Sequence, residues 1–152
     1  MLNDDYKEMM QCLSEENVKF LLVGAYALAV HGFPRATRDI DFFVWATPEN
    51  AASLMRALVR FGAPVEGISE ADFASEGVIF QIGNSPRRID IITRIDGVGF
   101  EQAYANRETF SIENLDVPVI SLEDLIANKR ATGRTQDLAD VERLESQLNA
   151  KR

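Results

Sequence analysis

The alternation of hydrophobic and polar positions is sharpest between residues 20 and 44, where it predicts a strand, a helix and a second strand. Residues 20–23 form a short apolar run, which is typical of a strand buried on both faces. Gly24 allows a tight turn and a close approach of the backbone to a ligand. Residues 25–31 fit a short helix, and the next strand runs to Val44. We expect the rest of the chain to pack around this strand–helix–strand unit.

The remaining elements follow from helical spacing, capping residues and turn residues. Helices are predicted at residues 3–16, 48–60, 100–106, 121–130 and from 135 onwards. Strands are predicted at 65–68, 78–82, 87–93 and 117–120, the last as an edge strand because Pro118 lacks an N–H. The last helix carries Leu138, Val141, Leu144 and Leu148 along one side. This order predicts an α/β (α+β) fold, with a mixed β-sheet flanked by helices and a C-terminal helical pair at 121–150.

Length and composition narrow the class of protein. With 152 residues, the chain is expected to form a single domain, 1–152. Its 46% hydrophobic and 26% charged residues are ordinary for a globular protein. The net charge of −8 argues against a broad basic surface for nucleic acid. One cysteine excludes an internal disulfide and a cysteine-built zinc site. No apolar run is long enough for a membrane span and no signal peptide is recognisable, so we expect a cytoplasmic protein.

Two aspartates on the second strand are the first candidate for chemistry. Side chains two residues apart on a strand share a face, so Asp39 and Asp41 are expected about 7 Å apart at their Cα atoms. Two like charges beside a hydrophobic core should either have raised pKa values or require a countercharge. That charge is supplied either by Arg35 and Arg38 in ion pairs or by a divalent cation such as Mg²⁺ (or Mn²⁺), which binds carboxylates together with phosphate oxygens.

The neighbouring elements favour a phosphate-handling site. A helix that begins directly after Gly24 presents free N–H groups to an anion. On a later strand Asp90 is a third carboxylate, and it shares a face with Arg88 and Ile92. If that strand neighbours the one with Asp39 and Asp41, the three carboxylates form a two-metal site, with Asp90 as a metal ligand and general base.

The spacing of these residues resembles the polymerase-beta-type nucleotidyltransferase superfamily. Gly24-Ala25 is followed by the 13 residues 26–38, then by Asp39-Ile40-Asp41, and Asp90 comes later. The string GAYALAVHGFPRATRDIDFFV is similar to the small branch that contains minimal nucleotidyltransferases and AbiEii-type toxins of toxin–antitoxin systems. The resemblance implies transfer of a nucleoside monophosphate from an NTP to a hydroxyl. It also implies that Asp39, Asp41 and Asp90 are the catalytic metal ligands.

The resemblance extends to the nucleotide-binding residues. The family usually has Ser or a second Gly where this chain has Ala25, which leaves a backbone N–H but no hydroxyl for the triphosphate. The segment SLEDLIANKRATGRTQDLADV is similar to the C-terminal part of the same branch, in which the lysine matching Lys129 is expected near the triphosphate. Arg38 either neutralises the aspartates or binds a phosphate. Asp137 and Asp140 are expected to pair with Arg134 or Arg143 on the surface.

Two classes of function remain open at this stage. In the first, the protein is a metal-dependent nucleotidyltransferase with an RNA, tRNA, protein or small-molecule acceptor, and a component of a toxin–antitoxin pair. In the second, it is a catalytically weak or inactive binding or regulatory module of the same fold, which acts through an antitoxin or another helical partner protein. Ala25 and the short chain favour the second class, whereas the retained carboxylates favour the first.

Overall fold

The computed structural model describes residues 2–33 and 39–151. Within them the chain forms helices and strands in the order α1 (Asp4–Glu15), β1 (Phe20–Val23), α2 (Gly24–Val30), β2 (Ile40–Val44), α3 (Pro48–Phe61), α4 (Glu70–Phe73), β3 (Ile79–Ile82), β4 (Ile89–Ile92), α5 (Phe100–Ala105), β5 (Glu108–Ile112), β6 (Leu115–Val119), α6 (Leu122–Thr132) and α7 (Thr135–Lys151). The expected mixed α/β class is therefore confirmed. Arg35 and Arg38 lie outside the described residues.

The strands form one six-stranded mixed sheet in the order β3-β4-β2-β1-β6-β5. Strand β1 is antiparallel to β2 and parallel to β6, and β2 is parallel to β4. The outer pairs, β3 with β4 and β5 with β6, are antiparallel. Strands β1 and β2 are thus central, as their hydrophobic sequences require, because a central strand has both faces covered.

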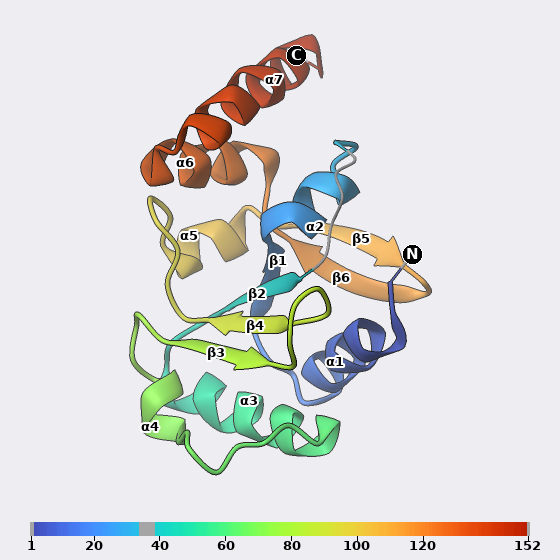
Figure 1. Ribbon diagram of the computed structural model, residues 1–152, viewed down its shortest axis with the longest axis vertical. Helices are drawn as coiled ribbons and strands as arrows, with labels where there is room; N and C mark the ends of the chain where they lie inside the picture. Colours follow the sequence, from blue (N-terminus) through green and yellow to red (C-terminus); the bar gives the residue numbers. More distant parts are fainter. Residues whose placement is uncertain (1, 34–38, 152) are drawn as a thin grey trace.

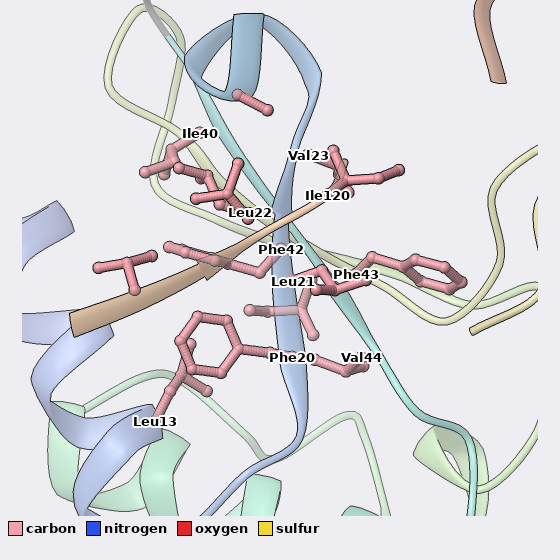
Figure 2. Close-up of a cluster of buried hydrophobic side chains, with 14 of the residues drawn as sticks. Leu13, Phe20, Leu21, Leu22, Val23, Ile40, Phe42, Phe43, Val44 and Ile120 are labelled. Carbon is pink, nitrogen blue, oxygen red and sulfur yellow. The ribbon is translucent and has the colours of Figure 1, made fainter. Parts of the chain in front are cut away.

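The core surrounds the two central strands. All four residues of β1 are buried, and Figure 2 shows their side chains among those of β2, with Leu13 of α1 and Ile120 close by. Phe20 and Phe42 meet edge to face, with ring centroids 5.6 Å apart. Helices α3 and α4 lie at one end of the molecule and α6 and α7 at the other (Figure 1). The site described below lies towards the α6–α7 end, because α2 leaves β1 there.

Local sequence signals place most helix ends correctly. The Asn3 side chain accepts a hydrogen bond from the backbone N–H of Tyr6, and Thr47 accepts one from Asn50, so both helix starts are capped as predicted. Helix α6 ends at Gly133, whose φ of +68° is the left-handed conformation that favours glycine.

Two strand predictions were wrong. Residues 65–68 form a turn closed by the Ile68 N–H donating to the Val65 carbonyl, with Gly67 inside it. Strand β6 lies inside the sheet because β5 covers its outer side. Strand β5 was not predicted, because only Phe110 and Ile112 alternate with exposed polar residues and so short a pattern did not reveal the strand. Pro118 is tolerated because it lies just before the point where β6 pairs with β1, Val119 opposite Leu22.

The C-terminal helices α6 and α7 form the expected pair. Val141 and Leu144 are buried and Leu148 is partly buried against the core. Leu138 is 49% exposed, so it does not belong to the predicted buried side. Among residues 2–33 and 39–151, none of the helices has the length and apolar character needed to cross a membrane.

Candidate active site

Three neighbouring strands place the last residue of β1 and two aspartates in one row. Val23 of β1 is opposite Asp41 of β2, and Asp41 is in turn opposite Asp90 of β4. Because β2 and β4 are adjacent and parallel, Asp41 and Asp90 project from the same face of the sheet. The proximity of Asp90 to the Asp39–Asp41 strand, which the sequence left as an assumption, is confirmed.

Gly24 brings the start of α2 against this row. Its φ is +71°, and a Cβ added at this position would collide with Oδ2 of Asp41. An L side chain at this position is therefore strained by the backbone conformation and has room only if the Asp41 side chain moves. The chain uses this freedom to turn from β1 into α2 directly beside a carboxylate, which leaves the helix start and Asp41 on the same side of the sheet.

Asp39 precedes β2 and is held by the turn between β3 and β4. Its Oδ2 accepts a hydrogen bond of 2.6 Å from the Ser85 hydroxyl, and its Oδ1 accepts one of 3.0 Å from the backbone N–H of Arg88. The Arg88 guanidinium lies 3.4 Å from Asp39 and donates to Asp90 at 2.8 and 3.3 Å. Among the described residues, Arg88 is thus the cation that these two aspartates contact.

Asp41 carries the strongest electrostatic perturbation of the site. Burial, followed by the negative charge of Asp90 and a side-chain hydrogen bond with Asp90, raises the pKa of Asp41 from 3.8 to about 7. Asp39 acts in the same direction, and Arg88 partly opposes the shift. Ionised Asp41 and Asp90 therefore lack sufficient positive charge around them at neutral pH. Such a pair attracts a cation.

Helices α6 and α7 contribute a second charged cluster. The Lys129 ammonium lies 3.5 Å from Asp137 and 3.2 Å from Asp140, and all three side chains are at most 12% exposed. Arg134 and Thr132 donate to Asp137 at 2.7 and 2.8 Å. Although burial works to raise it, these hydrogen bonds and the charge of Lys129 hold the pKa of Asp137 below its usual value.

The surface ion pairs expected for Asp137 and Asp140 are only partly observed. Asp137 does contact Arg134, but both aspartates are buried and both hold Lys129. Lys129 is thereby fixed in one place instead of extending into solvent. Sequence spacing alone could not indicate this contact, because it depends on how α6 packs against α7.

We expect a Lys129→Met substitution to lower the free energy of unfolding by about 2 kcal/mol, because two buried carboxylates then face each other without the ammonium group. Urea denaturation at pH 7 measures the change. Arg130→Met, on the same helix but 55% exposed, is the control and is expected to cost at most about 0.5 kcal/mol. Equal losses in the two variants would contradict a structural role of the cluster.

A cavity of about 720 Å³ connects the two groups of charged residues. It is lined on one side by Gly24, Ala25 and Asp41 and on the other by residues of α6 and α7 that include Lys129 and Asp137. This volume lies in the range of small-molecule and cofactor sites. The cavity therefore brings together the start of α2, Asp41 of β2 and the α6–α7 pair, which are far apart in sequence.

The candidate residues fall into three groups. Asp41 lies beside Gly24 and opposite Asp90, and Asp39 and Asp90 share the Arg88 guanidinium. The cavity lining includes Gly24, Ala25, Asp41 and Lys129. Arg38 is outside the described residues. Sequence reasoning missed the contact of Arg88 with the aspartates, although the position of Arg88 two residues before Asp90 on one strand face was a usable signal.

Comparisons with known proteins give the family and the fold of the chain. The family model described as nucleotidyl transferase AbiEii toxin, type IV toxin–antitoxin system, matches residues 9–149. No curated protein sequence matches the chain.

Solved structures give the same fold. TM1012 of Thermotoga maritima, described as a nucleotidyltransferase, superimposes with a TM-score of 0.59 at 20% identity, over 99% of this chain and 96% of that one. The lincosamide antibiotic adenylyltransferase LnuA, bound to lincomycin, gives 0.62 at 15% identity over 96% and 98%. The antibiotic-resistance factor ANT(2'')-Ia gives 0.64 at 15% identity over 97% and 84%.

Proposed function

Because the chain belongs to the AbiEii nucleotidyltransferase toxin family, we propose that it transfers a nucleoside monophosphate from an NTP to a hydroxyl acceptor with the help of a divalent metal. The observation that carries this proposal is the row formed by Asp41 and Asp90 beside Gly24 at the edge of the cavity. The two carboxylates thus lie next to the turn at Gly24, where the absence of a side chain leaves the backbone close to Asp41.

The carboxylates suit a hard cation that shares its coordination with the substrate. Asp41 and Asp90 are adjacent and short of positive charge, as the raised pKa of Asp41 indicates. Within residues 2–33 and 39–151 no three His, Cys, Asp or Glu side chains are arranged to hold an ion by themselves. Mg²⁺ commonly takes one or two carboxylates and completes its shell with waters and phosphate oxygens. Asp41 and Asp90, joined by Asp39, are the proposed ligands, and bound Mg²⁺ or Mn²⁺ would neutralise charge on the reacting phosphates.

The protein's own groups have defined roles in this reaction. The N–H groups of Gly24 and Ala25 bind the triphosphate, and Lys129 contributes a positive charge from the opposite wall of the cavity. Arg38 is proposed as a further phosphate contact. The acceptor hydroxyl oxygen forms a bond to the α-phosphorus while the bond from that phosphorus to the bridging oxygen breaks, and pyrophosphate leaves. A carboxylate oxygen of Asp90 accepts the hydroxyl proton.

The family also suggests the biological setting. Its description as a type IV toxin–antitoxin system supports an antitoxin as partner. We propose an RNA or protein acceptor in the cytoplasm, where NTPs are available. The net charge of −8 argues that any RNA contact is local to the site.

The test is transfer of label from four α-phosphate-labelled NTPs to cell RNA and protein, with Mg²⁺ or with a chelator. We expect metal-dependent transfer in the wild type and at least a roughly hundredfold loss in Asp41→Asn and Asp90→Asn. Asp116→Asn, at an exposed position of β6, is the control and should retain activity. Binding of NTP without transfer to RNA or protein would instead favour the regulatory module or an enzyme whose acceptor is absent from the assay, such as a small molecule.

A further inference from the structure

The Arg88 guanidinium occupies both oxygens of one site aspartate and lies against another. Its Nε donates to Oδ1 of Asp90 at 2.8 Å and one terminal nitrogen donates to Oδ2 at 3.3 Å. The same terminal nitrogen lies 3.4 Å from Oδ2 of Asp39. This forked contact is the strong form of an arginine–carboxylate pair. One side chain therefore contacts Asp39 and Asp90 and offsets part of their negative charge.

The backbone of Arg88 is fixed on both sides. Its N–H donates to Asp39, and its carbonyl accepts hydrogen bonds from the backbone N–H of Ile40 at 3.0 Å and from the Tyr6 hydroxyl at 3.3 Å. The guanidinium also donates to the Ser85 hydroxyl, which itself donates to Asp39. The side chain is 29% exposed, so it is anchored at its base and still reaches water at its end. The turn between β3 and β4 thus directs the guanidinium at the carboxylates.

A divalent cation and this guanidinium need the same oxygen atoms. A carboxylate that binds a metal ion directs a lone pair of at least one oxygen at the ion, and Arg88 engages both oxygens of Asp90. Two cations at one carboxylate also repel each other. A metal ion that binds Asp90 on the side facing Arg88 displaces a hydrogen bond of the guanidinium, and a metal ion on the remaining lone pairs is repelled by it. In both cases the contact with Arg88 lowers the affinity of Asp90 for the metal.

We propose that Arg88 is a built-in competitor of the divalent cation, which holds Asp39 and Asp90 in the metal-free protein and leaves Asp90 when the metal binds. The inference rests on the proposed function in one respect, namely that Asp41 and Asp90 bind the metal. Beyond the proposed function, it assigns to Arg88 the control of how tightly the site binds the metal ion. The contact of Arg88 with Asp39 and Asp90 stabilises these carboxylates without metal and lowers their affinity for it.

Binding of Mn²⁺ alone, without nucleotide, tests the proposal. Free Mn²⁺ is counted by electron paramagnetic resonance in titrations of the wild type, Arg88→Gln and Arg87→Gln. Arg87 is the adjacent exposed arginine of the same turn, so both variants lose one positive charge and differ in the contact with the aspartates. We expect Arg88→Gln to bind Mn²⁺ about tenfold more tightly than Arg87→Gln, as the loss of one charged hydrogen bond predicts.

A second measurement separates competition from a purely structural role. Without metal, Arg88→Gln is expected to melt at a lower temperature than Arg87→Gln, and saturating Mn²⁺ should close most of this gap. A structural role alone would leave the gap unchanged. Arg88→Lys, which keeps the charge but not the fork, is expected to bind Mn²⁺ with intermediate affinity, and it serves in place of Arg88→Gln if that variant does not fold.

Three results would overturn the proposal: equal Mn²⁺ affinities in Arg88→Gln and Arg87→Gln, weaker binding in Arg88→Gln, or no binding in any variant. The outcome is independent of catalysis because no NTP is present. Tight binding by Arg88→Gln together with an absence of nucleotidyl transfer refutes the proposed function and leaves this inference standing. If the wild type transfers nucleotide but Arg88→Gln binds Mn²⁺ no more tightly than Arg87→Gln, the proposed function stands and this inference is refuted.

Discussion

An Asp41→Asn variant is expected to be more stable than the wild type at pH 8 in metal-free buffer. In the unfolded chain Asp41 ionises near its ordinary pKa of 3.8, whereas the folded protein retains the proton up to about pH 7. Between these values the folded state binds more protons, so the stability of the wild type falls as the pH rises from about 4 to about 7. Asn cannot ionise and avoids this loss. The gain at pH 8 amounts to at most about 4 kcal/mol.

Urea denaturation from pH 4 to pH 8 with a chelator present measures this difference. The two proteins should differ little near pH 4, because the loss of stability begins only as the pH rises above the unfolded pKa of 3.8, and they should diverge above it. Asp116→Asn, exposed on β6, is the control and should follow the wild type at every pH. A difference that does not change with pH, or a variant less stable than the wild type at pH 8, would refute the electrostatic account of Asp41.

The second large effect is expected for Gly24→Ala, which should destabilise the protein and abolish nucleotidyl transfer. The left-handed backbone at Gly24, with φ of +71°, costs an alanine about 1–2 kcal/mol. Its Cβ also collides with the Asp41 carboxylate, so Asp41 has to move away from its position beside Asp90. We expect this crowding to cost about 1–3 kcal/mol more.

Gly62→Ala separates the two contributions. Gly62 caps α3 with a φ of +91° and has nothing within 4 Å of an added Cβ, so it carries the backbone cost without the collision. Urea denaturation and the transfer assay are applied to both variants. Gly24→Ala should lose more stability than Gly62→Ala and lose activity, while Gly62→Ala remains active. Equal stability losses with full activity in both would show that the Gly24–Asp41 contact is unimportant.

Local patterns were sufficient for most of the fold. The apolar run of β1, the cap at Thr47 and the left-handed Gly133 are each encoded within a few residues, and these elements were predicted closely. Strand β5 was missed because its apolar alternation is short, with only Phe110 and Ile112 partly buried between exposed polar residues. For the same reason β6 was assigned to the sheet edge: its position depends on the strand that covers it.

For the candidate site, the sequence proposed residues but could not give their contacts. The short spacing of Asp39 and Asp41, and the alternation around Asp90, made these carboxylates candidates from sequence. The neighbourhood of β2 and β4 is a long-range pairing that no local pattern specifies. The contact of Arg88 with Asp39 and the burial of Lys129 between two aspartates depend on such packing, so they became visible only in the structure.

The parallel pairing of β2 with β4 also links the site to the folding of the chain. Asp39 and Arg88, which meet at the site, are 49 positions apart, and helices α3 and α4 and strand β3 lie between them. Closing such a loop costs chain entropy before any contact is gained, so the carboxylates meet only after distant segments have joined. A ligand that contacts all three carboxylates therefore binds the folded protein and not the unfolded chain. Metal or nucleotide binding should therefore shift the folding equilibrium towards the completed protein, in proportion to ligand concentration.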